Sequence, residues 1–145
     1  MADLHFSTEL NWTGTGRDGE GTVLLASEQV TYSAPASMGG KGAGTSPEEL
    51  LIAAVASCYS GTLFGVLKKE GLSVEQVKIR AEGEVTGYPF QAKFAQLQVS
   101  PVIVGADKAK LAAYQDAALV ARDKCFIGKT ITGNVAYEVG NVELD

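Results

Sequence analysis

Two cysteines, Cys58 and Cys125, are the side chains of this sequence best suited to nucleophilic or redox chemistry. A thiolate can attack an electrophile, bind a metal ion or join a second sulfur in a disulfide. A metal site normally takes four ligands, and with His5 as the sole histidine we do not expect zinc. In a reducing cytosol a lasting disulfide is unusual, and transient redox pairs are the common exception. The plain alternative is two inert packing groups, because free cysteines are often buried.

Composition limits the partners of this chain. Its 145 residues predict a single domain, residues 1–145, and its net charge of -5 argues against nucleic acid and against an anionic membrane surface. The start "MADLHFSTELNW" has neither the basic residues nor the apolar core of an export signal. The apolar run Leu50–Ala56 is too short to span a bilayer. We therefore expect a cytoplasmic protein.

The element that carries Cys58 is a predicted helix over about Pro47–Lys69. Ser46 can cap it, Pro47 suits its first position, Glu49 completes a capping box, and Gly71 ends it. The helix is apolar on nearly every side, so we expect it to be buried on every side. The simplest cover is a second subunit across a two-fold axis, and the alternative is that another helix of the same chain covers the far side.

The other elements are predicted from alternation of apolar and polar residues. The order βββ-α-ββ-α-β indicates an α+β fold. The predicted strands are Leu4–Trp12, a strand near Val23–Ala26, "QVTYSA", a hairpin of "VEQVKIRAEGEV" with "FQAKFAQLQVSPVIV", and a last strand in "GNVAYEVGNVEL"; a second helix spans about Asp107–Lys124.

Cys58 needs a neighbouring group to become ionised, because burial raises the pKa of a thiol. It lies about three turns from the start of its helix, beyond the reach of the helix dipole. Its own helix offers no cation nearby, so a cation must come from elsewhere. Arg17, in the turn "GTGRDGEG", is the best candidate, and the alternative is that Arg17 is a solvated surface charge.

Glu48 can serve the same site only indirectly. Along a straight helix it lies about 15 Å from Cys58, so the two side chains of one helix cannot touch. It would have to hold an intervening arginine through a bidentate pair, or come from a partner subunit. The plain alternative is an acidic residue that favours the helix dipole in the first turn.

These residues carry a resemblance to the OsmC/Ohr family, the osmotically inducible and organic hydroperoxide resistance thiol peroxidases. The stretch "GTSPEELLIAAVASCYS" resembles the family signature G-T-N-P-E-[EQ]-L…A-x-x-[AG]-C-[FY], with Ser46 in place of the common asparagine. "GRDG" around Arg17 and "GGKGAGT" before the helix resemble the Ohr branch. Cys125, after the second helix and before "GNV", falls where the family has its other thiol. The resemblance does not select between the two branches.

The resemblance implies an intertwined homodimer whose central helices are wrapped by antiparallel sheets, with sites at the interface. It implies that Cys58 is the peroxidatic cysteine and Cys125 the resolving one. It further implies that Arg17 activates Cys58 and that Glu48 orients Arg17. The implied substrate is an organic hydroperoxide in preference to hydrogen peroxide, and the implied reductant is a lipoyl-type dithiol. No metal, haem, flavin or other cofactor is implied.

Two features depart from the family pattern or add to it. The family usually has C-P-x-S around the second cysteine, where this chain has "CFIG", residues Cys125 to Gly128. That change is expected to alter how Cys125 packs or forms a disulfide. Lys41 in the glycine-rich loop is a second cation that could replace or assist Arg17.

Thiol chemistry then predicts the reaction. The Cys58 thiolate attacks the peroxide, becomes a sulfenic acid and condenses with Cys125, and a dithiol reduces the disulfide. Apolar residues around the site could accept an alkyl tail, namely Leu51, Val55, Phe126 and Ile127. Two alternatives remain, a non-enzymatic thiol sensor or apolar-ligand carrier and a structural dimer with inert thiols. A Cys–His hydrolase is excluded because His5, the sole histidine, lies in the first predicted strand.

Overall fold

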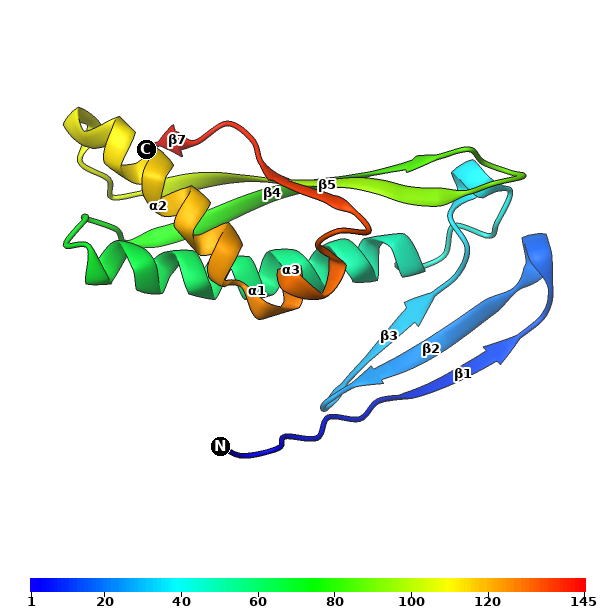
Figure 1. Ribbon diagram of the computed structural model, residues 1–145. Helices are drawn as coiled ribbons and strands as arrows, with labels where there is room; N and C mark the ends of the chain where they lie inside the picture. The colour runs from blue at the N-terminus through cyan, green and yellow to red at the C-terminus, as the bar shows by residue number, and fades with distance from the viewer. The chain divides into compact units, whose positions relative to one another are not determined.

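The computed structural model describes residues 1–145, and their packing forms two units, 1–50 and 51–145, which we describe one at a time. The elements follow the order βββ-α-ββ-α-α-β-β (Figure 1). This agrees with the predicted α+β class and adds one helix and one strand to the predicted order.

The N-terminal unit is a three-stranded antiparallel sheet. Its strands are β1 (Glu9–Thr13), β2 (Glu20–Leu25) and β3 (Glu28–Tyr32), and β2 lies in the middle. The glycine-rich turn between β1 and β2 contains the short 3₁₀ helix η1 (Gly16–Asp18), which carries Arg17. A second 3₁₀ helix, η2 (Ala36–Met38), lies in the loop after β3. The sheet therefore presents Arg17 on a tight turn at one of its ends.

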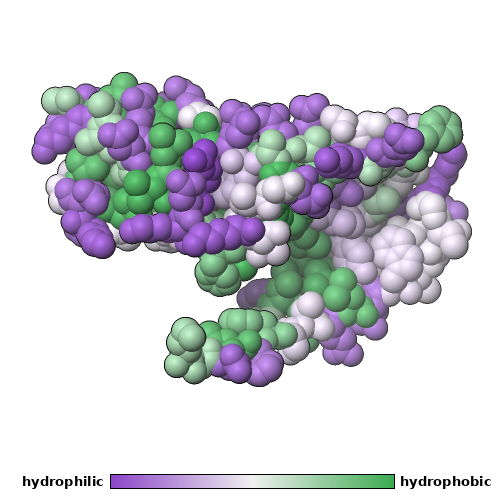
Figure 2. Space-filling model, in the orientation of Figure 1, coloured by the Kyte–Doolittle hydropathy of each residue, from purple (hydrophilic) through white to green (hydrophobic).

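The first strand is shorter than the sequence predicted. It begins at Glu9 instead of Leu4, because β2 supplies pairing partners for Glu9–Thr13 alone. All five β1 residues are exposed in the single chain, and so are Leu4 and Phe6 before it, 74% and 88% respectively. Hydrophobic side chains, green in Figure 2, mark this N-terminal segment. The predicted half-buried strand is therefore an exposed one within this chain.

Helix α1 (Pro47–Lys69) has the predicted limits. The Ser46 hydroxyl oxygen accepts a hydrogen bond from the Glu49 backbone N–H at 3.2 Å and donates one to the Glu49 carboxylate at 3.0 Å. At the other end Gly71 takes a positive φ of 71°, which a glycine adopts without strain. The N–H of Leu72 then bonds the Leu67 carbonyl at 2.9 Å, which closes the helix. Local signals at both ends thus fix this helix.

Within the C-terminal unit only one side of α1 is buried. The buried residues are Val55, Tyr59, Leu63, Val66 and Leu67, which join a core with residues of β5 and α2. On the other side Ala53, Ala54, Ser57, Gly61, Phe64 and Gly65 are exposed. Because α2 packs on the buried side, the alternative in which a second helix covers the far side is wrong. By length and composition alone α1 could cross a membrane, at a mean hydropathy of 1.9, but core helices of soluble proteins pass the same test.

The C-terminal unit contains a four-stranded sheet. The predicted hairpin is formed by β4 (Gln76–Thr86) and β5 (Lys93–Val104), which pair antiparallel with an irregularity between Glu84 and Val85. The predicted last strand is instead two, β6 (Ala136–Val139) and β7 (Glu143–Leu144), which both pair parallel to β5. The pairing is parallel because the chain crosses over through helices before it returns to the sheet.

That crossover holds two helices where the sequence predicted one. The predicted helix starts with the 3₁₀ helix η3 (Lys108–Lys110), where the Asp107 carboxylate accepts the N–H of Ala109 at 3.1 Å, and continues as α2 (Leu111–Lys124). A short further helix, α3 (Phe126–Ile131), follows. Cys125 lies between α2 and α3, so the fold places the second thiol at a helix junction.

Candidate functional site

The two cysteines lie together in the C-terminal unit. Cys58 is half-buried in the middle of α1, and Cys125 is fully buried at the N-cap position of α3. The sulfur of Cys125 accepts a hydrogen bond from the backbone N–H of Gly128 at 3.4 Å. Its thiol donates a hydrogen bond to the Val55 carbonyl oxygen at 3.9 Å, one turn before Cys58 on α1. Both cysteines are free thiols, and each shifts the pKa of the other.

The surroundings of Cys58 favour its thiolate. Burial raises the pKa of this thiol, but the hydrogen bonds that reach its sulfur outweigh burial and lower the pKa below its ordinary value. The strongest of these comes from the backbone N–H of Ile127, and the next comes from the Cys125 thiol. The Thr62 hydroxyl and the Phe126 backbone contribute less. Hydrogen bonds to the charged form of a group stabilise that form, so Cys58 has the more acidic thiol of the pair.

The pKa of Cys125 is shifted in the opposite direction, upwards. Burial raises the pKa of its thiol, and the neighbouring Cys58 sulfur raises it further, while the N–H of Gly128 lowers it in part. Cys125 therefore loses its proton at a higher pH than Cys58 does. The pair is suited to a reaction in which Cys58 acts first and Cys125 follows.

The sequence by itself points only to a cation as the source of stabilisation for Cys58. The structure adds neutral donors, the backbone N–H groups of Phe126 and Ile127 at the start of α3. The signal in the sequence was the segment "CFIG" itself, because a cysteine can accept a hydrogen bond at a helix N-cap. Cysteine is not among the preferred capping residues, so this helix start was missed.

Arg17 and Glu48 belong to the N-terminal unit. Arg17 is exposed and makes no ion pair there. Glu48 lies in the first turn of α1, and one of its carboxylate oxygens is buried without a hydrogen-bond partner. Lys41 forms an ion pair with Glu20 at 3.0 Å, so it already has a carboxylate partner. Within their own units the structure thus pairs Cys58 with Cys125 and leaves Arg17 and Glu48 with unused bonding capacity.

Four apolar residues are predicted from the sequence to accept an alkyl tail, and for Val55 this prediction is wrong. Its side chain is fully buried in the core. Leu51 and Ile127 are half-buried, and Phe126 is 67% exposed directly after Cys125. Leu51, Phe126 and Ile127 therefore remain as residues that could accept an alkyl tail, and the last two belong to α3.

Two tyrosines near the sulfurs were not singled out by the sequence analysis. The Tyr59 hydroxyl donates to the Ala118 carbonyl at 3.0 Å, which ties α1 to α2. The Tyr137 hydroxyl, on β6, is buried and makes no hydrogen bond of normal geometry, although it lies beside Cys125. Its position in the alternating pattern of "NVAYEV" marked it only as a strand residue.

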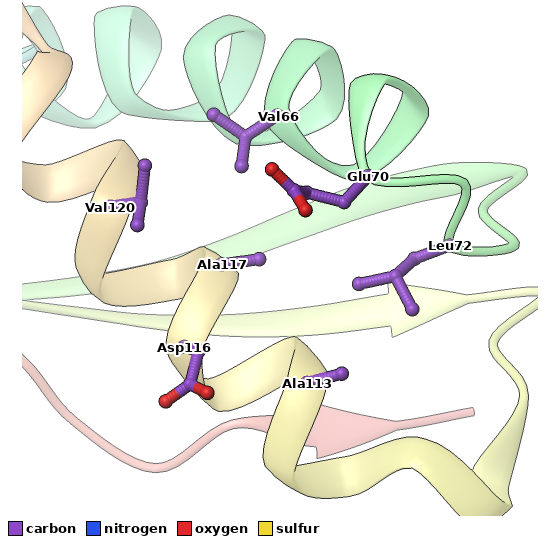
Figure 3. A pocket seen from close by; sticks show the side chains of 7 residues that line it. All are labelled: Val66, Glu70, Leu72, Ala113, Asp116, Ala117 and Val120. Atoms are coloured by element: carbon purple, nitrogen blue, oxygen red, sulfur yellow. The ribbon is translucent and has the colours of Figure 1, made fainter.

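A pocket of about 240 Å³ lies away from the cysteines, between the C-terminal part of α1 and α2 (Figure 3). Its floor is apolar, and two carboxylates, Glu70 and Asp116, stand at its edge; the other lining residues are Val66, Leu72, Ala113, Ala117 and Val120. Val66 lies about 12 Å along the helix from Cys58, so the pocket does not hold the nucleophile. No group of three or more His, Cys, Asp or Glu side chains is placed to hold a metal ion.

The comparisons with known proteins agree with this architecture. Residues 40–140 match the family described as OsmC-like protein. The uncharacterized protein YmaD of Bacillus subtilis (strain 168) is 31% identical over 142 residues, which cover 96% of this chain and 94% of YmaD.

Solved structures share the fold at lower identity. An organic hydroperoxide resistance protein OsmC from Legionella pneumophila matches with a TM-score of 0.72 at 23% identity, over 97% of this chain and 99% of its own. An OsmC-like protein from Mycoplasma pneumoniae matches with a TM-score of 0.78 at 16% identity, over 99% of each chain.

Proposed function

The chain belongs to the family of OsmC-like proteins, and from that membership we propose that it is a cysteine-based peroxidase that reduces organic hydroperoxides. The observation that carries the proposal is the sulfur pair, in which Cys58 has a lowered pKa and Cys125 a raised one. The similarity of the fold to an organic hydroperoxide resistance protein from Legionella pneumophila supports the same reaction.

The proposed reaction has three steps. The Cys58 thiolate attacks one peroxide oxygen, the O–O bond breaks, an alcohol leaves after gaining a proton, and Cys58 becomes a sulfenic acid. The thiol of Cys125 then displaces the sulfenic hydroxyl, which gives a disulfide and water. An external dithiol, which we take to be of the lipoyl type, reduces the disulfide and is itself oxidised to a cyclic disulfide. Hydrogen peroxide enters the same cycle more slowly, because it has no apolar part to bind beside Phe126.

Arg17 and Glu48 complete the proposed site. A guanidinium beside the Cys58 sulfur would stabilise the thiolate and polarise the bound peroxide. The buried, unpaired oxygen of Glu48 supports its role as the carboxylate that orients this guanidinium, since a buried carboxylate oxygen without a donor is costly. Lys41 is at most an assistant, because Glu20 holds it.

The proposed assembly is a homodimer in the cytoplasm. Support comes from the side of α1 that the C-terminal unit leaves exposed, where Ala53, Ser57, Gly61 and Gly65 would permit close approach of a second helix. Gly61 and Gly65 have nothing within 4 Å of the place where a Cβ would stand. A second copy of the chain would remove this apolar side from water.

A thiol count after oxidation tests the proposal. One equivalent of cumene hydroperoxide per chain should remove both free thiols, and a dithiol should restore them more efficiently than a monothiol. Cys58→Ser should abolish peroxide consumption, whereas Cys125→Ser should stop the reaction at a sulfenic acid that dimedone traps. Peroxide consumption that persists in Cys58→Ser would assign the nucleophile elsewhere. If no hydroperoxide is consumed by the wild-type protein, the sensor or structural alternative is correct.

A further inference from the structure

The hydroxyl of Tyr137 is a buried polar group for which the fold gives no ordinary partner. The ring projects from β6, and its oxygen is shielded from solvent without a hydrogen bond of normal geometry. Most buried hydroxyls are hydrogen-bonded, so an exception suggests a use in another state of the protein. The Tyr137 ring lies against Gly128, whose backbone N–H bonds the Cys125 sulfur, and the Tyr137 hydroxyl favours the thiolate of Cys125.

The absence of a side chain at Gly128 leaves room for the Tyr137 ring. A Cβ at position 128 would stand 2.3 Å from Cε2 of the Tyr137 ring, a distance at which the ring must move. The same glycine donates its backbone N–H to the Cys125 sulfur at 3.4 Å. Any side chain at this position would collide with the ring. Glycine at position 128 therefore allows the Tyr137 ring to pack beside the backbone that binds Cys125.

We propose that Tyr137 assists the resolving step, by donating its hydroxyl hydrogen bond to the Cys125 sulfur as that sulfur becomes a thiolate and attacks the oxidised Cys58. This inference rests on the proposed function, because it concerns the second step of that cycle. The overall step is the reaction of a sulfenic acid with a thiol to give a disulfide and water. The proton of Cys125 leaves with the displaced hydroxide, and Tyr137 keeps its own.

Oxidation of Cys58 explains why this donor acts at the second step. In the reduced protein the Cys58 sulfur raises the pKa of Cys125, both by charge and by accepting its thiol proton. A sulfenic acid carries no such charge, so these two effects disappear when Cys58 is oxidised. What remains beside Cys125 are the N–H of Gly128 and the hydroxyl of Tyr137, which both favour the thiolate.

Other titratable groups also lie near Cys125 and Tyr137. None of them is changed in the variants compared below. Tyr59 of α1 lies near both Cys125 and Tyr137, and burial raises its pKa. Tyr137 also lines a pocket of about 260 Å³ together with Arg122, Asp123 and Lys129. Burial also raises the pKa of Tyr137, so its hydroxyl stays protonated and remains a donor at neutral pH.

The variant Tyr137→Phe tests the proposal, because it removes one oxygen and keeps the ring against Gly128. In full-length protein, stopped-flow mixing with cumene hydroperoxide should show unchanged oxidation of Cys58. Formation of the disulfide should slow by about three- to tenfold, the range for one lost hydrogen bond. The pH profile of that second step should move to higher pH, and dimedone should trap more sulfenic acid. Tyr114→Phe is the matched control, since the Tyr114 hydroxyl bonds Ser73 and Asp107 away from the cysteines.

A second measurement does not depend on peroxidase activity. In a Cys58→Ser background the thiolate absorbance of Cys125 is titrated with and without Tyr137→Phe. The proposal predicts a higher pKa for Cys125 when the hydroxyl is absent. An unchanged titration and an unchanged resolving rate overturn it. If no hydroperoxide oxidises the wild-type protein, the proposed function has failed, and the titration alone still decides whether Tyr137 acts on Cys125.

Discussion

Cys58 and Cys125 shift each other's pKa in opposite directions: the Cys125 side chain helps to lower the pKa of Cys58, and the Cys58 side chain helps to raise the pKa of Cys125. Cys58 lies within α1 and Cys125 at the junction of α2 and α3, so the two acidities differ because the fold brings these segments together. One member of the pair is thereby a thiolate at a pH where the other is still a thiol. This difference is the basis of the proposed order in which the two sulfurs react.

The first prediction concerns the pH dependence of Cys58. Its pKa is lowered in the folded protein, so its thiolate is populated at a pH where an unfolded cysteine is still protonated. Alkylation by iodoacetamide should therefore begin at lower pH in the native protein than in urea. Cys125→Ala removes the neighbouring donor and should move the midpoint to higher pH, whereas Cys125→Ser keeps a hydroxyl donor and should move it less. Equal midpoints in all three proteins would contradict the role of Cys125.

The second prediction concerns Arg17 and Glu48. Arg17→Ala should lower kcat/KM for cumene hydroperoxide by about 10- to 100-fold, the loss expected for a charge-assisted hydrogen bond. Glu48→Gln should have a smaller effect in wild type and almost none in Arg17→Ala, because it acts through the arginine. Arg80→Ala is the control, since Arg80 is exposed and pairs weakly with Glu143 at 3.6 Å. Additive effects of the two substitutions would show that Glu48 does not act through Arg17.

The third prediction concerns the packing of Gly128. Gly128→Ala or Gly128→Ser should destabilise the protein by about 1–3 kcal/mol, because the new side chain collides with the Tyr137 ring. The measurement is the urea midpoint at unchanged slope. Combining Gly128→Ala with Tyr137→Ala should cost less than the sum of the two single changes, since the smaller residue relieves the collision. Strict additivity would place the strain elsewhere.

The fourth prediction concerns the uncovered side of α1. Gly61→Leu should stabilise α1 in the monomer, because leucine is a better helix former than glycine. The monomer has room for the new side chain, since nothing lies within 4 Å of a Cβ at this position. In a dimer with α1 helices at the two-fold axis the leucine would hold them apart. Light scattering during size-exclusion chromatography should then show dissociation at micromolar concentration. Ala112→Leu, on an exposed side of α2, is the control. A dimer of unchanged affinity in Gly61→Leu would exclude this side as the interface.

The sequence by itself determined the elements whose signals are local. Ser46, Glu49 and Gly71 fixed α1, because caps act on backbone groups within one turn. Alternation likewise identified the long hairpin of β4 and β5. Pairing to β2 shortened β1, however, because a strand extends only as far as its partner does.

Only the tertiary structure decided what surrounds each sulfur. The distance between Cys58 and Cys125 depends on how α2 crosses the sheet, and no local pattern specifies that path. Helix α3 went unpredicted because it is short and is capped by a cysteine. It is nevertheless the N–H groups of α3 that lower the pKa of Cys58. The sequence thus identified which residues could react, while the acidity that orders their reactions comes from hydrogen bonds between segments remote in the chain, which exist only once the core has packed.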